Sequence, residues 1–144
     1  MHPFVKNHSD PVSLDELVYR RVLNRLDFYD PELPVPVVYV AFRPTDADHD
    51  GISVYRPACG ATAVQVAFGN HYVAGLRVRD IVELDINGLR PTVVPSSEIT
   101  EIPGHALIPQ LNVTLRDGNK ERYRLLARRL AELAGKNIVH RPSE

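Results

Sequence analysis

Cysteine is scarce in this 144-residue chain: Cys59 is the single thiol, so no internal disulfide can form. A chain without disulfides is typical of a reducing compartment. Long apolar stretches are missing too, since no run approaches the roughly 20 residues that a membrane-spanning helix needs. The opening residues, MHPFVKNHSD, contain no hydrophobic stretch of the signal-peptide type. The sequence therefore predicts a cytoplasmic protein with no membrane partner.

An excess of one charge is also missing. The chain carries 17 Lys and Arg residues against 18 Asp and Glu residues, which gives a formal net charge of -1. Proteins that bind nucleic acids or membrane surfaces through charge are usually strongly basic. Nucleic acid is therefore not expected as a partner.

The remaining composition is that of a folded domain, with 44% hydrophobic and 24% charged residues. The length suits one domain, and the sequence shows no internal repeat and no linker. We therefore predict a single α+β domain over residues 1–144, with flexible ends at residues 1–12 and 137–144. The expected architecture is a mostly antiparallel sheet with an N-terminal and a C-terminal amphipathic helix. The sequence does not indicate an oligomeric state.

Helix signals mark both ends of the chain. Residues 13–16, SLDE, have the spacing of a capping box, and apolar residues then recur at helical spacing as far as Leu26. This helix is expected to end before Pro31, because proline disfavours helical geometry in the residue that precedes it. Residues 120–134 carry a second apolar stripe, which Gly135 is placed to terminate.

The middle of the chain has the pattern of strands. Residues 37–43 and 52–56 are rich in β-branched and aromatic side chains and flank the polar turn PTDADHDG, which indicates a hairpin. One face of each segment is apolar: Val38, Val40 and Phe42 in the first, Ile52 and Val54 in the second. If these faces enter the core, the alternation of a strand places the polar residues on the opposite face. The residues of this outer face are Tyr39, Ala41, Arg43, Ser53 and Tyr55.

The rest of the sheet is predicted from shorter segments. The further predicted strands are residues 71–76, 78–86, 89–94 and 111–115. The two middle segments flank Asn87 and Gly88, a strong hairpin signal, with a one-turn helix over residues 78–84 as the alternative. Residues 58–68 fit either a short helix or a buried strand, and residues 95–109 lack periodicity and are expected to form a loop.

The predicted binding site is formed by four residues of the hairpin's outer face: Tyr39, Arg43, Ser53 and Tyr55. An arginine beside aromatic rings suits a phosphate, a carboxylate or a nucleobase, because the guanidinium donates two parallel hydrogen bonds while the rings stack. The competing interpretation is a solvated sheet face with a cross-strand contact between its tyrosines, or between the arginine and a tyrosine.

His105 is the candidate catalytic residue among six histidines. It lies in the segment IPGHALIP, where the glycine permits a close approach of the backbone and the prolines stiffen the chain. A histidine held in this way suits an acid–base or binding role, and a buried histidine satisfied by the backbone is the alternative. The sequence contains no G-x-S-x-G elbow, no phosphate loop and no H-E-x-x-H helix.

The acidic turn DADHDG, at residues 46–51, resembles the start of a calcium loop. Such a loop needs a glutamate at its twelfth position, and Pro57 stands there instead. The geometry of a tight turn accounts for aspartate and glycine at these positions. No metal site and no cofactor is therefore predicted.

Three segments carry a resemblance to known sequences: AFRP at residues 41–44, DGISVY at residues 50–55 and PGHALI at residues 103–108. The stretch that holds them, about half of the chain, resembles a family of small uncharacterised bacterial proteins. The resemblance implies a free-standing bacterial protein of one domain and draws attention to Arg43, Ser53 and His105. It implies no reaction.

These features support two functional hypotheses. The first is a non-catalytic binding or accessory module that recognises a protein or a small anionic ligand through the outer face of the hairpin. The second is an enzyme acting on a phosphate-bearing substrate, with His105 as the acid–base group and Arg43 as the anion clamp. The second hypothesis requires both side chains to reach one pocket. A large exposed apolar patch would instead favour a purely structural subunit.

Overall fold

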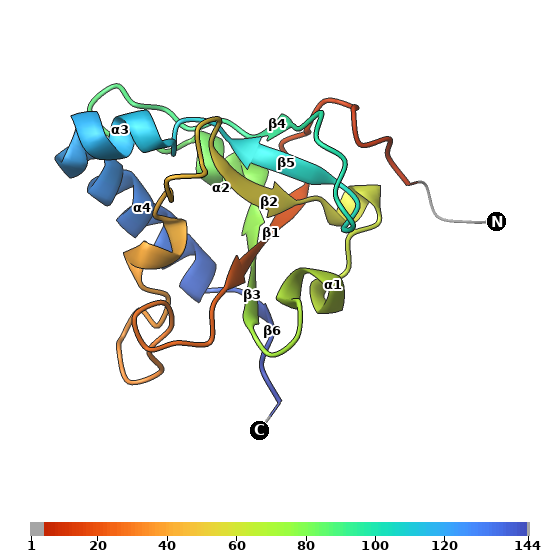
Figure 1. The fold of residues 1–144 in the computed structure, drawn as a ribbon, viewed down its shortest axis with the longest axis horizontal. Coiled ribbons are helices and arrows are strands. Elements are labelled where there is room, and N and C mark those ends of the chain that lie inside the picture. Colours follow the sequence, from red (N-terminus) through yellow and green to blue (C-terminus); the bar gives the residue numbers. More distant parts are fainter. Residues whose placement is uncertain (1–4, 144) are drawn as a thin grey trace.

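The computed structural model describes residues 5–143, which form one six-stranded sheet with helices on both faces (Figure 1). The strands are β1 (Leu17–Val22), β2 (Ile52–Tyr55), β3 (Tyr72–Arg77), β4 (Val94–Pro95), β5 (His105–Ile108) and β6 (Ile138–His140). Their order across the sheet is β4-β5-β2-β1-β3-β6, and every neighbouring pair is antiparallel. The predicted α+β class with an antiparallel sheet is confirmed. Residues 1–4 and 144, which belong to the predicted flexible ends, lie outside the described residues.

The helices are short except for the last one. They are the 3-10 helices η1 (Tyr39–Phe42) and η2 (Pro57–Cys59) and the α-helices α1 (Ala63–Ala67), α2 (Val78–Val82), α3 (Val113–Gly118) and α4 (Lys120–Gly135). The predicted C-terminal helix is confirmed as α4. Within the described part of the chain, no helix combines the length and the apolar character needed to cross a membrane.

The sheet separates two apolar clusters of unequal size. The larger cluster contains alternate residues of the central strands and the inner face of α4: Val18, Val22, Ile52, Val54, Leu76, Ile108, Leu126 and Leu130. The smaller cluster lies under α1 and comprises Ala61, Val66, Ala67 and Val73. Figure 1 shows α4 and α1 on opposite sides of the sheet. Because strand side chains alternate, Ser53 and Tyr55 of β2 point to the α1 side.

The predicted N-terminal helix is wrong, because Leu17–Val22 forms β1, a central strand of the sheet. The capping signal serves a turn instead: the Glu16 carboxylate accepts a hydrogen bond from the Ser13 backbone amide at 2.7 Å. β1 then pairs with β3 along its whole length, and Val18 and Val22 are fully buried. Strand pairing and burial therefore outweigh the local helical preference.

The predicted hairpin of residues 37–43 and 52–56 is wrong as well. β2 confirms the second of these strands, but Tyr39–Phe42 is the 3-10 helix η1. Both edges of β2 are occupied, one by β1 and the other by β5. Since no edge of β2 is left for residues 37–43, η1 packs against α4 and the larger cluster instead.

The strand predicted at residues 71–76 is confirmed by β3. The hairpin predicted to follow it is wrong: Val78–Val82 forms α2, which agrees with the helical alternative. Only an isolated bridge between Ile86 and Leu89 surrounds the Asn-Gly turn. The turn predicted at Asn87 and Gly88 therefore forms, but the strands predicted on either side of it do not.

Three smaller segments differ from the prediction or decide between its alternatives. The strand predicted at residues 111–115 is wrong, because the Asn112 side chain accepts a hydrogen bond from the Leu115 amide at 2.8 Å and caps α3. The segment 58–68 takes its helical alternative as α1. The predicted loop at residues 95–109 contains β5.

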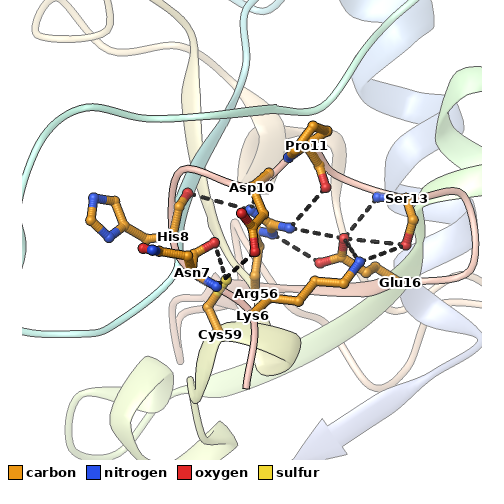
Figure 2. A network of polar contacts seen from close by, with 9 residues as sticks. All are labelled: Lys6, Asn7, His8, Asp10, Pro11, Ser13, Glu16, Arg56 and Cys59. Carbon is orange, nitrogen blue, oxygen red and sulfur yellow. Dashed lines mark hydrogen bonds and ion pairs between the residues drawn. The ribbon is translucent and has the colours of Figure 1, made fainter. Parts of the chain in front are cut away.

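A buried ion pair ties the N-terminal segment to the sheet (Figure 2). The Arg56 side chain is fully buried and donates two hydrogen bonds to the Glu16 carboxylate, at 2.8 Å and 2.9 Å. Its other donors reach the backbone carbonyls of Asp10 at 2.7 Å and Pro11 at 3.2 Å. Burial raises the pKa of Glu16, but hydrogen bonds from Arg56, the Ser13 amide and a lysine outweigh it and lower the pKa to about 2.

We predict that Glu16→Gln lowers the free energy of unfolding by about 3–5 kcal/mol, because it leaves the Arg56 guanidinium buried without its counter-charge. The matched control is Asp15→Asn, since Asp15 forms an exposed ion pair with Arg79 at 3.3 Å. This control should change stability little, as exposed pairs do. Urea unfolding of both variants measures the difference, and equal losses in the two variants would contradict a structural role of the buried pair.

Candidate functional site

The structure divides the five predicted site residues between the two faces of the sheet. Tyr39 and Arg43, from η1 and the residue after it, line a cleft on the α4 side. Ser53, Tyr55 and His105 lie together on the α1 side, and His105 lines a separate cavity there. The predicted combination of Arg43 with His105 is therefore not brought into one pocket.

The cleft on the α4 side, here called the cationic cleft, has a volume of about 820 Å³. It lies between the end of β1, η1, the end of α3 and the start of α4. Its lining includes seven basic residues and three acidic ones: Arg20, Arg21, Arg25, Arg43, Arg116, Lys120 and Arg124 against Asp27, Asp46 and Asp117. The guanidinium of Arg21 points away from the cleft, because its Nε donates to the Val66 carbonyl of α1 at 2.7 Å. The basic excess is local, because the chain as a whole is close to neutral.

The three carboxylates of the cationic cleft are already paired. Asp27 pairs with Arg25 at 3.1 Å, and both Asp46 and Asp117 pair with Arg116, at 2.6 Å and 2.9 Å. Hydrogen bonds from Arg116 to Asp117 and Asp46 raise the pKa of its guanidinium. The acidic turn at residues 46–51 therefore has a structural role, because the ion pair between Asp46 and Arg116 fastens it to α3.

Arg43, Lys120 and Arg124 remain available in the cationic cleft. All three are exposed, and their side chains form no hydrogen bond or ion pair with any residue that the structure describes. Three positive charges around one concave surface repel each other. A hydrogen bond from Arg116 lowers the pKa of the Asp117 carboxyl, with smaller contributions from Lys120 and Arg43, but that carboxylate is ion-paired with Arg116. The cleft therefore has the electrostatic character of an anion-binding site.

Arg20 forms part of the wall of this cleft and is held by backbone groups alone. Its Nε and Nη2 donate to the Ala41 carbonyl at 3.1 Å and 2.9 Å, and Nη1 donates to the Ser53 carbonyl at 2.7 Å. Burial lowers the pKa of the Arg20 guanidinium to about 10. The Asp48 carboxylate acts on Arg20 through space, but no described carboxylate forms an ion pair with it, so the guanidinium is hydrogen-bonded without a direct counter-charge.

Aromatic rings complete the cationic cleft. Tyr39 is half-buried, and the Arg128 guanidinium lies 5.9 Å from the centre of its ring. Phe28 also lines the cleft and has the Arg25 guanidinium 5.5 Å from its ring centre. Rings beside arginines provide a flat apolar wall next to the positive groups, which suits an organic anion.

The second candidate site is a pair of polar side chains on the other face of the sheet. The hydroxyl of Ser53 on β2 and Nε2 of His105 on β5 lie 2.8 Å apart. The ring of Tyr55 packs beside the imidazole, with the ring centres 5.5 Å apart. His105 is only 5% exposed, and its Nδ1 is buried without a hydrogen-bond partner among the described residues.

Gly104 positions His105 at the start of β5. It has a positive φ of 75°, and a Cβ atom there would lie 2.7 Å from the Arg56 carbonyl oxygen. Only glycine permits this approach of the two backbones without strain. The buried Arg56 and the catalytic candidate His105 are thus held next to each other by one glycine.

A cavity of about 300 Å³ lies beside His105. Its wall includes Cys59, Glu98, Ile99, Ile102 and Pro103. Burial raises the pKa of the Cys59 thiol, which keeps it protonated. Burial lowers the pKa of His105, and the Glu98 carboxylate acts in the opposite direction. The imidazole is therefore held in its neutral form near pH 7.

Sequence reasoning missed Arg20, Lys120 and Arg124 as parts of a site. Arg20 lies within the segment that the capping signal predicts to be a helix, and this helix does not form. The strand pattern contained a usable signal, because Arg20 stands between Val18 and Val22 at alternate positions, which places a charge on the core-facing side. Lys120 and Arg124 face the cleft only because α4 packs beside η1.

No protein-family model matches the chain, and neither the curated proteins nor the solved structures give a significant match. The function is therefore inferred from the geometry of the cationic cleft and of the Ser53–His105 pair.

We predict that the imidazole of His105 titrates with a midpoint below 6.5, its ordinary value, because burial disfavours the charged form. Glu98→Gln should lower the midpoint further, since the carboxylate favours the imidazolium. Glu101→Gln is the matched control, because Glu101 is exposed in the same loop and does not line the cavity. NMR titration of the imidazole protons measures all three values. A midpoint above 6.5 in the unsubstituted protein would contradict the buried, neutral state.

Proposed function

We propose that the protein is a binding module for a small anionic ligand, and that the ligand binds in the cationic cleft. The observation that carries the proposal is the set of basic side chains that form no ion pair with a described carboxylate: Arg20 in the wall and Arg43, Lys120 and Arg124 at the surface. Positive groups that converge on one concave surface are typical of sites for phosphate or carboxylate groups.

The shape of the cleft supports a small ligand rather than a protein partner. Its volume of about 820 Å³ falls in the range of sites for small molecules and cofactors. Tyr39 and Phe28 add apolar surface beside the arginines. An organic anion, such as a sugar phosphate or a nucleotide, would use both the charged groups and the rings.

Two of the residues predicted from the sequence, Tyr39 and Arg43, keep their proposed role in this site. Ser53 and Tyr55 do not line the cleft. His105 lines the other cavity, so the geometry favours binding of the anion over acid–base chemistry on it. A cytoplasmic location is part of the proposal, because the lone Cys59 is a buried free thiol.

We expect inorganic pyrophosphate to bind the cleft and to bind more weakly as salt is added, because salt screens exposed charges. Arg43→Gln and Arg124→Gln should each weaken binding roughly tenfold or more, since each removes a charged hydrogen-bond donor. The matched control is Arg77→Gln, because Arg77 is exposed on β3 and lies outside the cleft.

Isothermal titration calorimetry at low and moderate salt gives the four affinities. The proposal requires that the two cleft variants lose affinity while the Arg77 variant keeps it. Equal affinity in all four proteins, or an equal loss in the control, would show that pyrophosphate binds the surface without using the cleft.

A further inference from the structure

The cavity of about 300 Å³ beside His105 has no role in the binding proposed for the cationic cleft. It is enclosed by residues 6–8 of the N-terminal segment, by Cys59 of η2 and by residues 98–100 and 102–104 of the loop before β5. The Lys6 amide donates to the Ala58 carbonyl at 2.8 Å, and the Thr100 hydroxyl donates to the Ile102 carbonyl at 2.6 Å. Hydrogen bonds within and between the walls therefore hold the cavity in shape.

The uncompensated charge in the wall of this cavity is negative. The Lys6 ammonium donates to the Glu16 carboxylate at 3.1 Å and to the Ser13 hydroxyl at 3.0 Å, and Figure 2 shows its side chain extended toward both residues. The Glu98 side chain, in contrast, is exposed and forms no hydrogen bond or ion pair with any residue that the structure describes. A cation that enters the cavity is therefore attracted by Glu98, while the charge of Lys6 is already paired.

The other polar groups of the cavity do not oppose a cation. Burial lowers the pKa of His105 against the effect of Glu98, so its imidazole is neutral near pH 7. Burial raises the pKa of the Cys59 thiol, which keeps the thiol uncharged as well. His8, the remaining titratable group of the described wall, is exposed, so water and salt screen any charge on it.

The rest of the wall is largely apolar. Ile102 and Pro103 are half-buried, whereas Ile99 is 89% exposed beside the cavity. A ligand with an apolar body removes this surface from water, which favours binding. A metal ion does not fit, because no three His, Cys, Asp or Glu side chains in the described part of the chain are grouped so that they could hold one.

We propose that this cavity binds a small organic ammonium ion with an apolar body, such as an aryl or alkyl amine. The ammonium group lies beside the Glu98 carboxylate, and the body packs against Ile99, Ile102 and Pro103. A volume of about 300 Å³ is at the lower end of the range for small-molecule sites, which suits a ligand of this size. The protein then has two sites of opposite charge preference, one on each face of the sheet.

Two probes of nearly the same shape separate the charge from the apolar contact: 2-phenylethylamine, a cation at pH 8, and 2-phenylethanol, which is neutral. Isothermal titration calorimetry at pH 8 and low salt gives their affinities. We expect the amine to bind roughly fivefold more tightly than the alcohol, which is the upper effect of an exposed ion pair. Glu98→Gln should remove this advantage and leave the affinity for the alcohol unchanged. Glu101→Gln is the matched control, because Glu101 is exposed in the same loop and does not line the cavity.

A second pair of variants tests the apolar part of the site. Ile99→Ser should weaken the binding of both probes by a similar factor, roughly threefold or more, because it removes apolar surface that the ligand covers. Val64→Ser is its control, since Val64 is 69% exposed on α1 and lies outside the cavity. Both side chains are exposed, so neither substitution should unfold the protein.

The NMR signals of the carbon-bound imidazole protons of His105 locate the bound amine. They should shift saturably, while the backbone amide signals of Arg43 and Arg124 stay unchanged. Absence of binding, equal affinity for both probes, an unchanged affinity in Glu98→Gln, an equal loss in Glu101→Gln, or binding that does not shift the His105 signals would each overturn the proposal. None of these outcomes depends on pyrophosphate or on the cationic cleft, so they leave the proposed function untouched.

Discussion

The guanidinium of Arg20 fixes the relation between the sheet and η1, and the position of the cationic cleft depends on it. The ladder between β1 and β2 is short, with Tyr19 opposite Tyr55 as its register pair. Next to this pair the Arg20 side chain donates to the Ser53 carbonyl, and its other donors hold the Ala41 carbonyl of η1. One side chain thus completes the edge of β2 and anchors the helix that carries Tyr39.

The same strand geometry explains why the molecule has two candidate sites rather than one. Successive side chains of β1 and β2 point to opposite faces of the sheet. The Ser53 carbonyl accepts a hydrogen bond from Arg20 in the wall of the cleft, while the Ser53 hydroxyl is hydrogen-bonded to His105 on the α1 side. The cationic cleft and the Ser53–His105 pair are therefore separated by the thickness of the sheet, although both depend on the position of β2.

The sequence predicted the parts of the fold that local patterns determine. The stripe of residues 120–134 identified α4, and the alternation at residues 52–56 identified β2 and placed Ser53 and Tyr55 on one face. The N-terminal segment could not be predicted, because its capping glutamate, Glu16, is used by the buried Arg56. Likewise, Tyr39 and Arg43 do not lie beside Ser53 and Tyr55 as predicted. The edge of β2 on which residues 37–43 were expected to pair is occupied by β5, which comes from a segment expected to be a loop. Both errors arise from contacts between residues that are far apart in the chain. The periodicity of a local segment carries no information about such contacts.

The most direct test of anion binding in the cleft follows the guanidinium groups themselves. During a titration with inorganic phosphate, the NMR signals of the Nε–H groups report which arginines meet the anion. Binding in the cationic cleft requires saturable shifts at Arg20, Arg43 and Arg124, with Arg77 and Arg79 unchanged. Shifts of equal size at all exposed arginines, with none at Arg20, would contradict a site in the cleft and leave only weak attraction to the surface.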